Sequence, residues 1–219
     1  MVDSKQFAVI GLGMFGKSVA SALNEMGYEV LAIDADEEKV QDFSNVIPHV
    51  VQADTTDINS LKALGIRNFD VVIVAIGQNL QANILTTLLL NELGVANVVS
   101  KAQSEIHGKM LLKLGAARVV YPERDMGVRL AHSLVSSNVL EYIQLSPDLS
   151  IVEVSAPGSI VGKTLVEANL RARFEINVVA IKHGGELFVP PNPEKAINAG
   201  DTLFVVGRNK GVQAFEELK

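Results

Sequence analysis

The sequence predicts an α/β protein, with a doubly wound parallel sheet in its N-terminal part and a small α+β domain after it. Three observations favour this fold class. Short β-branched runs alternate with longer amphipathic segments up to about residue 122, a glycine-rich motif follows the first run, and the last third of the chain is rich in β-type runs. Regular strand–helix alternation is typical of a parallel sheet with helices on both faces.

Six apolar runs predict the strands of the parallel sheet, because strands covered on both faces are almost continuously apolar. These runs are residues 7–10, 30–33, 50–51, 71–75, 98–99 and 119–120. Amphipathic segments between them predict helices over residues 17–26, 36–43, 59–64, 81–93 and 105–114. The right-handedness of strand–helix–strand units then favours a Rossmann-like strand order.

After residue 122 the pattern changes, and we divide the chain there. We expect a nucleotide-binding domain over residues 1–122, a crossover helix and linker over 123–138 with the helix at 125–135, and a C-terminal domain over 139–219. In that last domain the sequence predicts strands at 151–154, 178–181, 187–189 and 203–206, a Gly184-Gly185 hairpin and a final helix at 210–218.

The composition excludes several functional classes. The 219 residues carry a formal net charge of −6, which argues against a protein that grips nucleic acid phosphates. Cysteine is absent, so disulfides, thiolate metal sites and cysteine nucleophiles are excluded. No run of about 18 apolar residues exists, and residues 1–6 are too polar for a secretory signal. We therefore expect a cytoplasmic protein that acts at a membrane only through a partner.

The sharpest motif is Gly11-Leu-Gly13-Met-Phe-Gly16, placed directly after the first predicted strand and at the start of a helix. Its first glycine permits a tight turn, the second lets the backbone approach a phosphate, and the third allows close packing of helix and strand. Asp34 ends the second strand, 18 residues beyond Gly16, where an acid binds ribose hydroxyls. The motif predicts nucleotide binding, and the alternative is a glycine-rich turn that only packs. The Asp34 carboxylate disfavours a ligand with a 2′-phosphate, such as NADP.

Other candidate ligand contacts follow the strands at the same edge of the sheet. Asp54-Thr55 follows the third strand, either as a helix cap or as a contact to adenine. The segment Ala75-Ile76-Gly77 follows the fourth strand, where we expect contact through the backbone.

Two charged residues stand at the far side of this edge. Lys101 ends the fifth strand, where it would meet a terminal phosphate. Glu123 follows the sixth strand and would hold magnesium or another divalent cation that bridges to that phosphate. The alternative for both residues is a solvated rim position.

Candidates for catalysis are scarce in the sequence. The four histidines are scattered, and the chain has no Tyr-x-x-x-Lys pair, no phosphate loop of the Gly-x-x-x-x-Gly-Lys type and no nucleophile elbow. A regulator is therefore favoured over an enzyme. The alternatives left open are an NAD(H)-dependent oxidoreductase and an NAD(H)-binding redox sensor.

Six motifs are more specific than the glycine pattern alone, and they lie at residues 6–13, 65–70, 72–77, 81–88, 101–103 and 122–127. With these motifs the chain resembles a known family, the RCK proteins (regulators of conductance of potassium), and among them the gating subunits of bacterial Ktr and Trk-type potassium uptake systems. The resemblance implies a homodimer that assembles into an octameric ring beneath a membrane potassium-translocating subunit. It also implies ATP and ADP as ligands of the N-terminal domain, with Met14 and Phe15 among the contacts, and a peripheral location at the inner face of the cell membrane.

The resemblance also implies a second ligand, cyclic di-AMP, in an RCK C-terminal domain. Arg171 would bind a phosphate, Asn177 would bond the base or ribose, and Val178 and Pro191 would pack on adenine. The chain departs from the family at two points. Met14 stands where arginine is common, and Phe174-Glu175 stands where an aromatic–glycine pair is usual.

Overall fold

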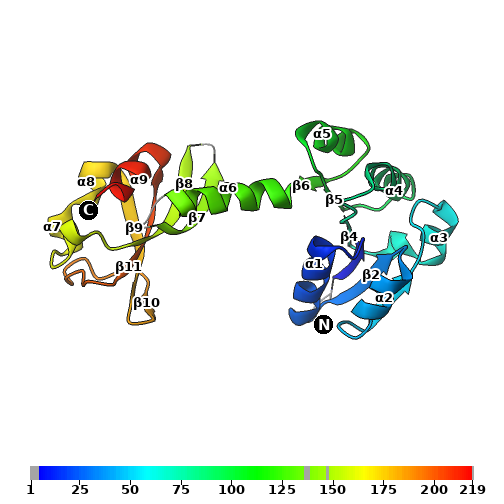
Figure 1. Cartoon of the computed structure of the whole chain (residues 1–219), viewed down its shortest axis with the longest axis horizontal. Coiled ribbons are helices and arrows are strands. Elements are labelled where there is room, and N and C mark those ends of the chain that lie inside the picture. The colour runs from blue at the N-terminus through cyan, green and yellow to red at the C-terminus, as the bar shows by residue number, and fades with distance from the viewer. Residues whose placement is uncertain (1–4, 136–138, 147, 219) are drawn as a thin grey trace. The chain divides into compact units, whose positions relative to one another are not determined.

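The computed structural model describes residues 5–135, 139–146 and 148–218 (Figure 1). The chain divides into two compact units, Met1–Glu123 and Arg124–Lys219, and each is described by itself. Residues 136–138 of the predicted linker lie outside the described residues. In the described part of the chain, no helix is long and apolar enough to cross a membrane.

The first unit holds a six-stranded parallel sheet in the order β3-β2-β1-β4-β5-β6. Its strands are β1 (Gln6–Ile10), β2 (Glu29–Asp34), β3 (His49–Gln52), β4 (Val71–Val74), β5 (Val98–Lys101) and β6 (Arg118–Val120). Strand β1 pairs with both β2 and β4, so the chain reverses its direction of travel across the sheet there. All six predicted strands are present.

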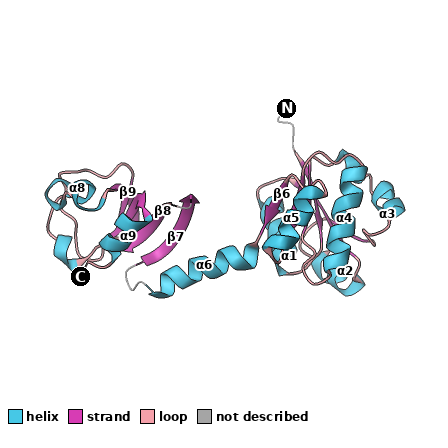
Figure 2. Ribbon diagram, turned by 90° about the horizontal axis from the view of Figure 1, so that it is seen from above, coloured by secondary structure: helices cyan, strands magenta, loops and turns pink. Residues whose placement is uncertain are grey.

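Helices cover both faces of this sheet (Figure 2). They are α1 (Met14–Glu25), α2 (Glu37–Phe43), α3 (Ile58–Ala63), α4 (Leu80–Glu92) and α5 (Glu105–Lys113), with a 3-10 turn at Ile66–Asn68. Successive residues of β1 enter opposite cores: Ala8 and Ile10 pack with α3 and α4, and Val9 packs with α1 and α2. This alternation explains why the strands read as continuous apolar runs.

The second unit is built on a five-stranded antiparallel sheet in the order β10-β9-β11-β8-β7. Its strands are β7 (Val139–Ser146), β8 (Leu149–Ser155), β9 (Ile176–His183), β10 (Glu186–Phe188) and β11 (Thr202–Arg208). Its helices are α6 (Pro122–Val135), whose first two residues belong to the first unit, α7 (Leu165–Ala168), α8 (Leu170–Phe174) and α9 (Asn209–Glu216), with a 3-10 turn at Gly158–Ile160. The predicted hairpin at Gly184-Gly185 joins β9 to β10, and both glycines have positive φ.

The structure differs from the sequence prediction at three places in the later part of the chain. Strand β7 was not predicted, and the short helices α7 and α8 precede the strand that begins at Ile176. Helix α6 starts at Pro122 rather than at residue 125, because proline is well tolerated in the first turn of a helix, where its missing N–H is not needed.

Candidate functional site

The glycine-rich motif forms a tight turn between β1 and α1. Gly11 has φ of +99° and its N–H donates to the carbonyl of Ile33 over 2.7 Å, which ties the turn to β2. A Cβ on Gly16 would lie 1.8 Å from the carbonyl oxygen of Gly11. The turn therefore requires glycine at both positions, for backbone conformation at the first and for space at the second.

The start of α1 is open to an anion. Gly13 caps the helix in an extended conformation, and a Cβ there would meet no described atom within 4 Å. In this part of the described chain, neither a side-chain cap nor an acidic residue occupies the first turn of α1. The first N–H groups of the helix therefore have no side-chain cap, and with the partial positive charge of the helix they suit an anion. The Met14 side chain beside it is 91% exposed.

Asp34 ends β2 beside the glycine turn, and its carboxylate organises that turn. One oxygen accepts a hydrogen bond of 2.6 Å from the Leu12 N–H, and the other accepts one of 2.9 Å from the Asp36 N–H. The Lys39 ammonium lies 3.8 Å from the same carboxylate. Asp34 is thus fixed at the point where a ribose would lie in a Rossmann domain.

The Asp54-Thr55 segment follows β3 at the same edge. The Asp54 carboxylate accepts bonds from the N–H and the hydroxyl of Thr56, and Asp57 rather than Asp54 caps helix α3. The Thr55 side chain is buried, and its hydroxyl lies 2.9 Å from that of Thr86 on α4. A contact from Asp54 or Thr55 to adenine stays a prediction.

The segment after β4 adjoins the glycine turn. A Cβ on Gly11 would lie 2.9 Å from the backbone nitrogen of Ile76, so the Ala75–Gly77 backbone borders the same crevice as the turn. The carbonyl of Gly77 accepts a hydrogen bond from the side-chain amide of Gln103. Gln103 belongs to the motif Lys101-Ala-Gln103 but is not among the site residues that the sequence predicts.

Lys101 and Glu123 form an ion pair at the carboxyl ends of β5 and β6. The Lys101 side chain is largely buried, and its ammonium lies 5.8 Å from the centre of the Phe15 ring. The Glu123 side chain is mostly exposed, and the hydrogen bond from Lys101 lowers the pKa of its carboxyl group. The two residues are therefore partners, and Lys101 is not the solvated rim residue of the alternative interpretation.

The chemistry available at this edge is that of binding. Glycine N–H groups, a fixed carboxylate and a buried ammonium can hold a polyanionic ligand with hydroxyl groups. Among the described residues, no group of three or more His, Asp or Glu side chains is placed to hold a metal ion. A cation at Glu123 would therefore take its remaining oxygen ligands from a phosphate, water or a second chain.

His107 on α5 lies close to this edge and gives the stability of the first unit a pH dependence. The residue is 4% exposed, accepts a 3.3 Å hydrogen bond at Nδ1 from the Gln103 N–H, and has no described partner at Nε2. Burial lowers its pKa below the usual 6.5. The contribution of neutral His107 to the stability of the folded unit is thus fully present above about pH 6.5. It is lost as the pH falls, because the unfolded chain takes up the proton first.

When the pH is lowered from 7.5 to 5.5, we expect the unfolding temperature of the wild-type chain to drop. The drop should be larger than that of a His107→Gln chain. Thermal denaturation at three pH values measures the difference, and His49→Gln, which replaces an exposed histidine, serves as the control. Identical pH profiles for wild type and His107→Gln would contradict this account.

In the second unit, the residues predicted for cyclic di-AMP are spread over three segments. Arg171 lies on α8 and is exposed, Asn177 and Val178 lie on β9, and Pro191 follows β10. Of these, Pro191 lines a small cavity of about 120 Å³, together with His183 and Asp201. His183 Nδ1 lies 2.5 Å from an oxygen of the buried Asp201 carboxylate.

Glu175, the departure noted in the sequence, ends α8 with φ of +56°. A left-handed conformation costs about 1–2 kcal/mol in residues other than glycine. Glycine would relieve that strain, which is a physical reason for the aromatic–glycine pair usual at this position.

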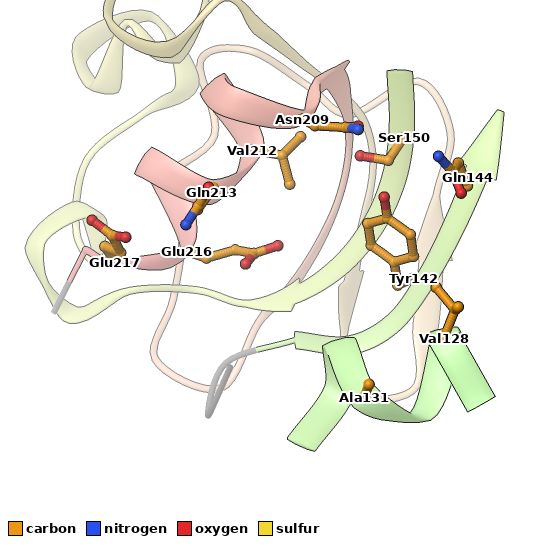
Figure 3. A pocket seen from close by; sticks show the side chains of 10 residues that line it. All are labelled: Val128, Ala131, Tyr142, Gln144, Ser150, Asn209, Val212, Gln213, Glu216 and Glu217. Atoms are coloured by element: carbon orange, nitrogen blue, oxygen red, sulfur yellow. The ribbon is translucent and has the colours of Figure 1, made fainter. Parts of the chain in front are cut away.

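A larger cavity of about 790 Å³ opens in the second unit between α6, β7, β8 and α9 (Figure 3). It is bordered by Val128 and Ala131 of α6, by Tyr142, Gln144 and Ser150 of the two strands, and by Asn209, Val212, Gln213, Glu216 and Glu217 at α9. None of the site residues predicted from the sequence is among these lining residues.

The strand order of the first unit, with a glycine turn after β1 and an acid at the end of β2, is that of a Rossmann-like domain. Residues 7–122 match the TrkA-N domain, and residues 149–219 match the TrkA-C domain. The chain is 50% identical to Ktr system potassium uptake protein C of Bacillus subtilis over 213 residues, which are 97% of this chain and 96% of that protein. The chain therefore belongs to the RCK family, and its resemblance there is to the Ktr potassium uptake proteins.

Two solved structures of GsuK are also similar to this chain. A GsuK channel bound to NAD matches with a TM-score of 0.54 and 25% identity, over 98% of this chain. A GsuK structure bound to ADP matches with a TM-score of 0.51 and 25% identity, over 62% of this chain. The chain spans only 38% and 35% of those two longer proteins.

Proposed function

We propose that this protein is a non-enzymatic regulatory subunit that binds an adenine nucleotide at the glycine-rich edge and thereby gates a membrane potassium-translocating partner. The observation that carries the proposal is the arrangement of that edge. The Asp34 carboxylate holds the Leu12 N–H over 2.6 Å, directly beside the open start of α1. The membership of the RCK family supports the regulatory role.

ATP and ADP are the proposed ligands. The proposed contacts are Gly11, Gly13, Met14, Phe15, Gly16, Asp34, Asp54, Thr55, Ala75, Ile76, Gly77 and Lys101. NAD(H) is the second candidate, and the specific observation in its favour is the NAD bound to the similar GsuK channel. Under that alternative the protein would sense redox state, or transfer hydride as an oxidoreductase.

One titration tests the proposal and separates its versions. Calorimetry of the full chain with ATP, ADP and NADH should show binding of both adenine nucleotides and weaker binding of NADH. Tighter binding of NADH would favour the redox sensor, and turnover of NADH with a carbonyl substrate would favour the oxidoreductase. Absence of binding by all three would overturn the proposed function.

Gating would follow from a shift between two states of the assembled protein. A ligand moves such an equilibrium only if it binds the two states with different affinity. Moving a gate from mostly closed to mostly open takes about 5 kcal/mol in total, which eight coupled sites would supply at under about 1 kcal/mol each. One phosphate contact that differs between ATP and ADP is large enough to supply that free energy.

Glu123 is proposed to hold magnesium or another divalent cation when a triphosphate is bound. The Lys101 ammonium pairs with its carboxylate. A terminal phosphate would attract the Lys101 ammonium, and the freed carboxylate and phosphate would supply the oxygen ligands that a hard cation prefers.

In a Glu123→Gln chain we expect the magnesium dependence of stabilisation by ATP to shrink at least severalfold, while ADP binding persists. Thermal denaturation with each nucleotide, with and without magnesium, measures this, and Glu105→Gln on the exposed face of α5 serves as the control. Equal loss of both nucleotides would mean that Glu123 acts only in folding.

The proposed assembly is a homodimer that forms an octameric ring, located in the cytoplasm and bound to the inner face of the membrane through its partner. Exposed apolar side chains on α5 support an assembly surface on the first unit; they are Ile106, Met110 and Leu112. Native mass spectrometry of the full chain tests the ring. A monomer at micromolar concentration would contradict it.

Cyclic di-AMP is proposed as a second effector, in the second unit. Arg171 is exposed on α8, so its guanidinium is free to form the two-pronged bond that phosphate accepts. Asn177 would hydrogen-bond the ligand, and Val178 and Pro191 would supply apolar walls for the purine.

Replacing Arg171 by Ala should weaken cyclic di-AMP binding by about 1.5–3 kcal/mol, or roughly 10- to 150-fold. The neighbouring Arg173→Ala is the control, because Arg173 already donates to the Ala168 carbonyl and lies over the Phe174 ring. Glu175→Gly should raise the affinity by removing an acid near two phosphates. No calorimetric binding by the wild-type chain at millimolar ligand would overturn this site.

A further inference from the structure

Helix α4 buries polar side chains where it crosses the parallel sheet. Asn83, Thr86, Thr87 and Leu90 are all 0% exposed, and only the last of them is apolar. A helix that covers a sheet normally buries an apolar stripe. The three polar residues, here called the α4 polar face, each bond to a residue near the carboxyl end of a strand.

Asn83 joins the ends of β4 and β5. Its side-chain amide nitrogen donates to the carbonyl of Ile76 over 2.7 Å and to the carbonyl of Lys101 over 3.1 Å. One side chain thus fixes the spacing between the Ile76–Gly77 backbone and the segment that carries the Lys101 ammonium. Its carboxamide oxygen is buried with no partner among the described residues. A buried polar atom without a hydrogen bond costs free energy, so packing alone does not explain an asparagine at this position.

The two threonines bond to neighbouring strand ends. The Thr86 hydroxyl lies 2.9 Å from the Thr55 hydroxyl and donates to the Thr55 carbonyl over 3.2 Å, which ties the helix to the loop after β3. The Thr87 hydroxyl lies 2.9 Å from that of Ser100 on β5. One helix face therefore reaches the ends of three strands, and all three border the proposed nucleotide site.

We infer that the α4 polar face positions the nucleotide site, with Asn83 setting its phosphate end and Thr86 its base end. The inference rests on the proposed function. It goes beyond that function because α4 supplies none of the proposed ligand contacts. Apolar residues of the same shape would fill the space equally well, but they would leave the strand-end carbonyls without donors and free to shift.

The test uses isosteric variants of the full chain and two ligands that differ by one phosphate, ADP and AMP. Asn83→Leu keeps the branching of the side chain and removes its donors, and Thr86→Val does the same for the hydroxyl. Calorimetry should show that Asn83→Leu lowers the affinity for ADP about tenfold and the affinity for AMP less than threefold. Thr86→Val should lower the affinity for both ligands by a similar factor, and Thr86→Ser should restore both affinities.

Leu90→Val is the control for lost stability, since Leu90 packs in the apolar core on the same helix face. It should lower the unfolding midpoint without changing either dissociation constant. If Asn83→Leu does not fold, the Thr86→Val and Thr86→Ser pair decides the question.

The outcomes separate this inference from the proposed function. A wild-type chain that binds neither ligand overturns both. A wild-type chain that binds, with affinities within twofold in Asn83→Leu and Thr86→Val, overturns the positioning role alone. Equal weakening of ADP and AMP by Asn83→Leu also overturns it, because loss of stability does not depend on the number of phosphates.

Discussion

A Gly16→Ala chain is expected to lose the folded structure of its first unit, and nucleotide binding with it. The added Cβ would lie 1.8 Å from the carbonyl oxygen of Gly11, which is a backbone atom and cannot turn aside as a flexible side chain would. Gly11 is itself held by its hydrogen bond to Ile33 and by the backbone of Ile76. Overpacking of this kind costs about 3 kcal/mol or more, a large part of the stability of a domain.

Denaturant unfolding followed by circular dichroism measures this effect, because the two compact units can unfold as separate transitions. The transition of the second unit should stay unchanged. Gly127→Ala is the matched control, since a Cβ there would meet no described atom within 4 Å and alanine favours the helix. Wild-type stability in the Gly16→Ala chain would contradict the geometry described for the turn.

An Asp34→Ala chain should bind adenine nucleotides about 1.5–3 kcal/mol more weakly, which is roughly 10- to 150-fold, since a hydrogen bond to a charged group is lost. The effect has a second source in the structure. The carboxylate also accepts the bond from Leu12 that orders the glycine turn, so the variant loses both the proposed ligand contact and the alignment of the turn.

Asp36→Ala separates these effects from a general loss of stability. Asp36 lies two residues away and caps α2 through bonds to Glu38 and Lys39, so its removal should cost about 1 kcal/mol of stability. The nucleotide affinity of the Asp36→Ala chain should match that of the wild type in calorimetry. Equal affinities in the Asp34→Ala chain and the wild type would remove the ribose site from Asp34.

The first unit was predictable from sequence because its signals are local. Strands buried on both faces give continuous apolar runs, and residues such as Ala8, Val9 and Ile10 leave no ambiguity. Strand β7 gave no such signal. Its register shifts between Val139 and Glu141 and again near Ser146, and only Tyr142 of its described apolar side chains is buried, so the alternation of a half-buried strand is broken.

The candidate site was predictable only where sequence spacing fixes geometry. The distance from Gly16 to Asp34 indicates a ribose site because one strand–helix–strand unit connects them. The pairing of Lys101 with Glu123 joins residues 22 positions apart on different elements, and no local pattern predicts it. Asn83 was equally hidden, since an asparagine in a helix ordinarily indicates a solvent-facing or capping residue.

Nucleotide exchange at the glycine-rich edge is proposed to control a membrane partner, and ion flux tests this control most directly. The full chain would be reconstituted with its membrane potassium-translocating subunit in liposomes, and rubidium uptake would be followed with ATP and with ADP. We predict that the two nucleotides give different flux through the wild-type complex and that Asp34→Ala abolishes the difference. Equal flux with ATP and ADP in a wild-type complex that binds both would contradict the account.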